Sequence, residues 1–354
     1  MRSESECDET GHASYVLFLQ LLDLDLGKNM RLHRRRFLEL AASIVASSYS
    51  SSAATAQAYP KGVVRIVLGS TAGGGTDIIA RLMGQWLSQR FSQSFIVDDH
   101  PGAGSNIATE AVVRAAPDGQ TLLLVTTANA INATLYDKLA FDFMRDIEPI
   151  SGIARVPLVM VVNPAFPAKT VPEFIAYAQT HPGTINMATG GIGGSPYVAG
   201  VLFKLMTGIN LTLVPYRGLA LALTDLLGGQ VQALFSSLPA AGEFIKTNKS
   251  RALAVTTAVR APSHPDIPTI DEFVPAFEAS QWYGLGAPRN TPSEIIDTLN
   301  KEINLGLADQ KLRSQLGNLG GTVLESTPGE FRKFVASETE KWRKIIKLSG
   351  AKAN

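Results

Sequence analysis

Two glycine-rich turns hold the residues of this sequence that are best suited to chemistry. One spans residues 69–75 and is followed by Thr76 and Asp77, and the other spans residues 190–194 and is followed by Ser195. Each stands between an apolar strand and a helix, where backbone N–H groups and hydroxyls can bind an anion without a buried cation. The pattern predicts a carboxylate site, although glycine also suits a purely structural turn.

Further candidates follow the predicted strands. Thr127, Asn129 and Asn132 come after the third strand, at the carboxyl end where open α/β sheets bind ligands. Tyr216 follows a later strand and could reach the same site, and its neighbour Arg217 suits a ligand contact and a bracing salt bridge equally.

The first helix has two polar residues whose roles need not involve the ligand. Thr76 can serve as the helix N-cap. Asp77 lies in the first turn, where the helix dipole favours an acid whatever the ligand. We therefore expect Asp77 to brace the loop more than to contact the ligand, with both roles open.

Catalytic and metal chemistry have little support in the sequence. Ser195 stands in Gly-Gly-Ser-Pro-Tyr, which lacks the last glycine of a nucleophile elbow, and no histidine has a supporting motif. The single cysteine, Cys7, lies in the N-terminal segment, and the histidines after it show no metal-ligand spacing. We expect no catalytic residue, no metal and no cofactor.

The elements around these turns alternate between strand and helix. Apolar runs at 63–68, 95–98, 121–126, 185–188, 211–215, 231–235, 251–257 and 281–287 predict strands, with helices between them and three more after residue 292. A long apolar run, 150–162, is a candidate strand passing between domains. This order predicts an α/β fold with mostly parallel sheets and two domains, 59–157 plus 259–354 and 158–258, with a ligand cleft between them.

Composition agrees with a globular protein. The chain has 354 residues, of which 45% are hydrophobic and 18% charged, with a formal net charge of +1. This excludes a disordered chain and a disulfide scaffold, and it gives no electrostatic reason to expect a nucleic acid partner.

The N-terminus has the pattern of an export signal. From Met30 a basic region precedes a moderately apolar stretch and an Ala56-Gln57-Ala58 cleavage site, so residues 30–58 are expected to be a signal peptide. Arg34 and Arg35 fit a twin-arginine signal, and an Arg-rich Sec signal is equally possible. We interpret residues 1–29 as an upstream start artefact and expect a periplasmic mature protein.

Several motifs together resemble the Bug-type receptors, the TctC-like extracytoplasmic solute receptors of tripartite tricarboxylate transporters. They include VRIVLGSTAGGGTDIIARLMGQWLSQR, DDHPGAGSNIATEAVVRAAPDGQTLLL, ATGGIGGSPYVAGVLFKLMTG and WYGLGAPRNTP. The resemblance implies a two-domain periplasmic-binding-protein-like fold of type II. It also implies a receptor, expected to be monomeric, that closes on a small carboxylate and delivers it to a membrane transporter.

In this family the first glycine loop holds a ligand carboxylate and the second closes from the other domain, which here implies residues 70–77 and 190–197. Ser236 stands where the family commonly has Asp, which argues against a ligand ammonium group at that position. The candidate ligand-binding residues are Ser70, Thr71, Ala72, Gly74, Thr76, Asp77, Thr127, Asn129, Asn132, Gly191, Gly193, Ser195, Tyr197, Tyr216 and Ser236.

Three alternatives stay open at this point. The chain could be an exported α/β hydrolase or transferase acting on carboxylic acids, or a binding protein that serves a sensor. The ligand itself could be a dicarboxylate, a tricarboxylate, an aromatic acid or a neutral amide.

Overall fold

A computed structural model describes residues 59–216 and 218–353, and residues Ala58–Asn354 form one compact unit. The predicted start artefact and signal peptide, residues 1–58, lie outside the described residues, as does Arg217. Among the helices of this described part, none combines the length and the apolar character that a membrane span requires.

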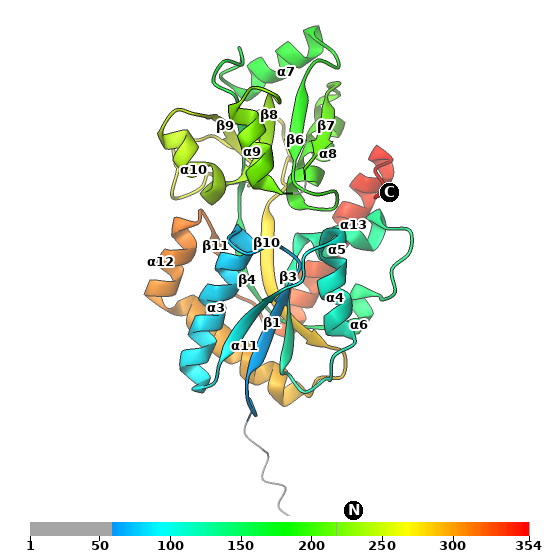
Figure 1. Cartoon of the computed structure of the whole chain (residues 1–354), viewed down its shortest axis with the longest axis vertical. Coiled ribbons are helices and arrows are strands. Elements are labelled where there is room, and N and C mark those ends of the chain that lie inside the picture. Colours follow the sequence, from blue (N-terminus) through cyan, green and yellow to red (C-terminus); the bar gives the residue numbers. More distant parts are fainter. Residues whose placement is uncertain (1–58, 217, 354) are drawn as a thin grey trace, which may run out of the picture. The chain divides into compact units, whose positions relative to one another are not determined.

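The first sheet has six strands in the order β11-β4-β10-β3-β1-β2 (Figure 1). Their bounds are β1 (Val64–Leu68), β2 (Phe95–Asp99), β3 (Thr121–Thr126), β4 (Ile147–Val156), β10 (Gln281–Pro288) and β11 (Thr322–Val323). Strands β1, β2 and β3 pair in parallel, whereas β10 runs antiparallel to both of its neighbours, β3 and β4.

The second sheet has five strands in the order β7-β6-β8-β5-β9. They are β5 (Leu158–Val162), β6 (Asn186–Thr189), β7 (Thr212–Pro215), β8 (Ala233–Ser237) and β9 (Arg251–Val255). Strand β6 is parallel to β7 and β8, and β5 is antiparallel to β8 and β9.

The expected α/β architecture with two sheets is confirmed, but the prediction of mostly parallel sheets is wrong. Both sheets are mixed, because the strands next to the crossings between sheets, β4, β5 and β10, join antiparallel partners. A strand buried on both faces has the same continuous apolar sequence whichever way its neighbours run, so the pattern could not reveal direction. The predicted domain boundaries stay a prediction.

Helices cover the faces of both sheets. The first sheet carries α3 (Gly75–Phe91), α4 (Asn106–Val113), α5 (Thr127–Leu135), α6 (Phe143–Asp146), α11 (Ser293–Ala308), α12 (Gln310–Asn318) and α13 (Pro328–Ser349), with a 3-10 turn, η1 (Ala103–Ser105), before α4. The second carries α8 (Ser195–Thr207), α9 (Leu219–Leu227) and α10 (Leu238–Lys246), and α7 (Val171–Thr180) follows β5.

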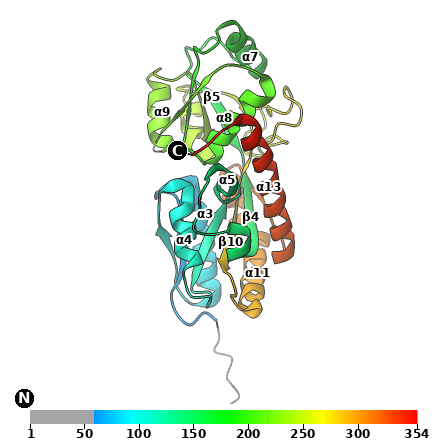
Figure 2. The same ribbon diagram turned by 90° about the vertical axis from the view of Figure 1, so that its right-hand side faces the viewer.

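Helix α13 is the longest of the described helices and links distant parts of the fold. Its start is defined by a capping box, in which the Thr327 hydroxyl accepts from the Glu330 amide while the Glu330 carboxylate accepts from the Thr327 amide. It packs along α5 and β4, and its end lies beside α8 (Figure 2). Gly284 of β10 admits the Phe331 ring, because a β-carbon at Gly284 would lie 2.1 Å from Phe331 Cζ.

Helix α5 was not expected. The residues after the third strand were interpreted only as polar residues at a strand end, yet Thr127–Leu135 is a helix. Thr126 and Asn129 form its capping box, with Asn129 Oδ1 accepting from Thr126 N at 2.8 Å. An asparagine at the third position replaces the usual Glu or Gln, so the motif is hard to recognise from sequence.

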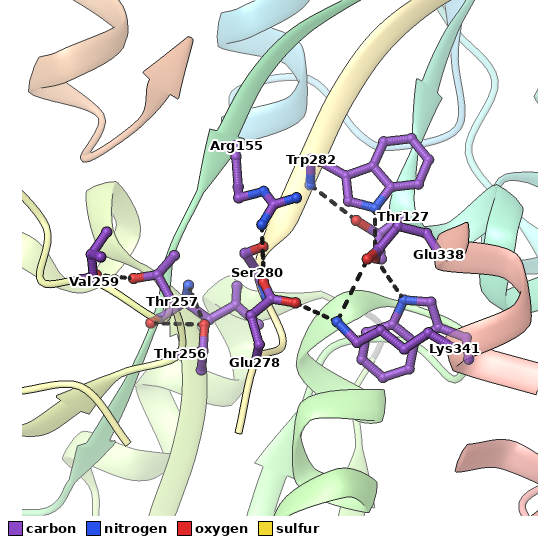
Figure 3. A network of polar contacts seen from close by, with 12 residues as sticks. Thr127, Arg155, Thr256, Thr257, Val259, Glu278, Ser280, Trp282, Glu338 and Lys341 are labelled. Atoms are coloured by element: carbon purple, nitrogen blue, oxygen red, sulfur yellow. Dashed lines mark hydrogen bonds and ion pairs between the residues drawn. The ribbon is translucent and has the colours of Figure 1, made fainter. Parts of the chain in front are cut away.

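A polar network lies where the chain crosses between the sheets (Figure 3). The apolar run 150–162 does make one crossing, but as two strands, β4 and β5, separated by Pro157. In the return crossing, Glu278 pairs with Lys341 of α13 and lies 3.7 Å from Arg155 of β4. Burial by itself would raise the pKa of Glu278, but Lys341, Ser280 and Arg155 together outweigh it and lower that pKa. The crossing is thus tied to α13 and β4 while Glu278 stays charged.

Candidate functional site

The first glycine loop joins β1 to α3 and leaves the start of that helix uncapped by any side chain. Helix α3 begins at Gly75 with Gly74 as N-cap, so the prediction of Thr76 as the cap is wrong. Gly74 adopts extended backbone, and Thr76 lies beside the buried hydroxyl of Tyr283 on β10. Burial raises the pKa of Tyr283, which keeps it a neutral support under the loop. The first N–H groups of α3 are therefore available to an anion.

Asp77 braces this loop. Its carboxylate accepts from Gly73 N at 2.8 Å and pairs with Arg81 Nε at 2.8 Å, and the residue is 3% exposed. Burial by itself would raise the pKa of Asp77, but the hydrogen bonds from Arg81 and Gly73 outweigh it and hold the pKa below its usual range. Arg81 also lies 3.8 Å from Asp99. Arg81 is thus paired with protein acids.

Neutral amides lie beside the loop. Asn132 of α5 is 1% exposed, and its Nδ2 donates to Gly104 O and to Asn106 Oδ1, the latter at 3.2 Å. Gly69 permits the approach of this turn, because a β-carbon there would lie 2.3 Å from the Cα of Ser105. The 102–106 turn and α5 therefore form one wall next to the first glycine loop.

The second glycine loop, residues 190–194, meets this wall from the other sheet. A β-carbon on Gly193 would lie 2.6 Å from Asn132 Oδ1, and one on Gly104 would lie 3.4 Å from the carbonyl oxygen of Ile192. Gly193 is buried with φ +87°, a conformation that glycine adopts without strain. Helix α8 starts at Ser195 with Gly194 as N-cap, and no side chain caps it. The structure thus places the second loop against the 102–106 turn and α5, and the first loop adjoins the same turn at Gly69.

The buried polar atoms of this region without a hydrogen-bond partner include three neutral ones, Ser70 Oγ, Asn106 Nδ2 and Asn132 Oδ1. They also include two carboxylate oxygens, Asp99 Oδ1 and Asp77 Oδ1, of which Asp77 Oδ1 is paired with Arg81. Buried polar groups in folded proteins are almost always hydrogen-bonded, so such atoms need a further partner. The neutral atoms, one amide donor, one amide acceptor and one hydroxyl, are of the kinds that can bind a small polar solute.

Other predicted residues have bonds inside the protein. Thr127 Oγ1 accepts from Trp282 N at 3.0 Å, and Asn129 Nδ2 donates to Thr109 Oγ1 at 2.8 Å. Tyr216 donates to Asp225 Oδ2 at 2.7 Å, and Ser236 is fully buried in β8 with its hydroxyl donating to Ser237 O at 3.3 Å. Among the described residues, the Tyr216 and Ser236 hydroxyls therefore bond outside the glycine loops.

The remaining predicted residues lie on the loops or on α8. Thr71, Ala72, Gly74 and Gly191 are exposed, Ser195 is buried, and Tyr197 is half-buried, with its pKa raised by burial. Sequence reasoning missed Asn106 and Tyr283. Asn106 could have been noticed, because it directly follows the Pro-Gly-Ala-Gly turn, whereas nothing local marks Tyr283. Among the described residues, no cluster of His, Cys, Asp and Glu could hold a metal ion.

Comparison with known proteins identifies the family. The tripartite tricarboxylate transporter family receptor model matches residues 79–351. The chain belongs to this receptor family. The family consists of solute-binding receptors, which excludes the alternative of an exported hydrolase or transferase.

Solved structures of similar receptors share the fold. Rpa4515 of R. palustris, solved with adipate, is 34% identical, covers 83% of this chain and 99% of its own, and has a TM-score of 0.79. The periplasmic binding protein BugD is 32% identical with coverages of 84% and 100% and a TM-score of 0.77. MatC from Rhodopseudomonas palustris, with bound malate, is 29% identical with coverages of 81% and 100% and a TM-score of 0.75.

Proposed function

We propose that this receptor captures a small carboxylate between its two glycine loops in the periplasm and delivers it to a tripartite tricarboxylate transporter. One observation carries the proposal: two helix N-termini without side-chain caps adjoin buried amide and hydroxyl atoms that have no protein partner. Helix N-termini favour anions through their free N–H groups and dipole. The similar receptors solved with adipate and with malate support the same ligand class.

The proposed site is assembled from both sides of the sheet crossings. The first side supplies Ser70, Thr76 and the Asn106–Asn132 pair, and the second supplies Ser195 and the amides of residues 191–194. Because the crossings are few, we propose that the predicted domains, 59–157 plus 259–354 and 158–258, open and close around the ligand. The contact of Gly193 with Asn132 corresponds to the closed arrangement.

A thermal-shift panel on the exported protein tests the ligand class. Malate, adipate, citrate and benzoate are compared with adipamide, the neutral analogue of adipate. Ligand that binds only the native state raises the free energy of unfolding by about 2.7 kcal/mol at a hundredfold excess over Kd. We expect at least one carboxylate to raise the melting temperature and adipamide to leave it unchanged. Equal shifts with adipate and adipamide would argue for a neutral-amide receptor instead.

A further inference from the structure

A groove lies along α8, and its lining includes no residue of the two glycine-rich turns, 69–75 and 190–194. Its volume is about 570 Å³, and its lining comes from α8, from the segment 208–213 and from the end of α13. Its lining side chains include Tyr197, Val201, Lys204, Leu205, Leu213 and Leu348. Figures 1 and 2 both place the end of α13 next to α8, in agreement with the contacts between these helices.

Most of the lining is apolar, and part of it is unusually exposed. Leu205 is 41% and Leu348 73% exposed, and they face the groove together with Val201 and Leu213. Adjacent large apolar side chains left in water commonly mark a binding surface. Such a surface favours the apolar part of a ligand.

Lys204 is the one charged side chain among the described lining residues. Its Nζ donates to Leu211 O at 2.6 Å. An ammonium has three N–H donors, so two are left for a ligand. Within the same described lining the Tyr197 hydroxyl is a further polar group, and no carboxylate is present. The charge at this groove is complementary to an acid.

The size of the groove decides between a protein partner and a small one. Small-molecule sites typically measure about 300–1,000 Å³. A stable protein interface needs about 800 Å² on each partner, which is far more than these ten lining residues can supply. We propose that the groove is a second binding site, for an amphipathic organic anion with an apolar chain and one carboxylate, the carboxylate bonding Lys204.

Calorimetric titration with sodium octanoate tests this on protein exported from cells that express the full chain. We expect one site whose affinity falls at least about tenfold in Lys204→Met, because a charge-assisted hydrogen bond is lost. Lys204→Arg should retain binding. Lys344→Met is the matched control, because Lys344 is an exposed cation of α13 outside the lining, and it should change nothing.

Octanoate binding by two further variants tests whether the groove is separate from the proposed carboxylate site. Leu348→Asp, at an exposed position, should weaken octanoate binding through like charge even if Lys204→Met fails to fold. Thr76→Ala with Ser195→Ala should leave octanoate binding intact, because these residues belong to the proposed carboxylate site.

Four results would overturn the second site without deciding the proposed function. They are no binding of octanoate, equal binding of octanol, loss of octanoate binding in the Thr76→Ala, Ser195→Ala variant, and a dimer in light scattering that Leu205→Ser dissociates. The last result would assign the groove to a second copy of the chain.

Discussion

Replacing Gly193 by alanine should weaken carboxylate binding in addition to lowering the free energy of unfolding. The added methyl group would lie 2.6 Å from Asn132 Oδ1 and 3.3 Å from Leu135 Cδ2. To restore an ordinary contact of 3.4 Å with Asn132, the second glycine loop must withdraw by roughly 0.8 Å. Withdrawal opens the junction at which we place the ligand.

The magnitude has two parts. Alanine in left-handed backbone at φ +87° costs about 1–2 kcal/mol whether or not ligand is bound, so this part lowers only the free energy of unfolding. The overlap with Asn132 arises only when the loop lies against α5, so its cost lowers affinity. We expect Kd to rise about tenfold, which corresponds to about 1.4 kcal/mol.

Gly191→Ala is the matched control in the same loop. Its β-carbon would have no heavy atom within 4 Å, and its φ lies outside the left-handed region. Calorimetry with the carboxylate that gives the largest thermal shift should therefore show near-native affinity for Gly191→Ala. If Gly193→Ala binds that ligand as tightly as Gly191→Ala does, the contact between the loop and Asn132 is irrelevant to binding and the reasoning fails.

Further predictions concern the helix starts, a buried acid and the N-terminus. Replacing Thr76 and Ser195 together by alanine should weaken carboxylate binding by about 1.5–3 kcal/mol in calorimetry. The melting temperature should change little, because glycines are the N-caps of both helices. An unchanged Kd with a lower melting temperature would show that neither hydroxyl belongs to the site. Asp77→Asn should lower the free energy of unfolding at pH 7 by about 1–3 kcal/mol. The pKa of Asp77 in the folded protein is lowered from 3.8, so the charged carboxylate stabilises the fold above pH 3.8, and this stabilisation is lost as the pH falls through the folded pKa. The free energies of unfolding of the native protein and of Asp77→Asn, measured with urea, should therefore converge at low pH. Intact mass of the exported protein should begin at Tyr59, and a mature species that retains Cys7 would contradict both the signal peptide and the start-site interpretation.

Local sequence signals predicted most of the elements. Apolar runs, glycine turns and caps act over a few residues, so a strand such as Thr121–Thr126 was predicted with the bounds that the structure has. The two glycine turns were recognised because each directly follows a strand and precedes a helix. The family resemblance rests on the same motifs in the same order, and the comparison confirms it.

Strand direction and the composition of the site depended on contacts between distant residues. Nothing near Gln281–Pro288 specifies that β10 lies antiparallel between β3 and β4, because this is a property of the pairing. In the same way, Thr76 meets Tyr283 and Gly193 meets Asn132 only after the sheets have formed.

The sequence by itself therefore determined which segments become strands, helices and anion-binding turns, because backbone preference and apolar periodicity are local. Only the tertiary structure decided which polar side chains are fully hydrogen-bonded within the protein. Asn129 and Asn132 are three residues apart on one helix, yet Asn129 has both amide atoms bonded within the protein while Asn132 keeps an unpartnered oxygen at the loop junction. That difference arises from what each side chain faces across the packed interior, which no local pattern encodes.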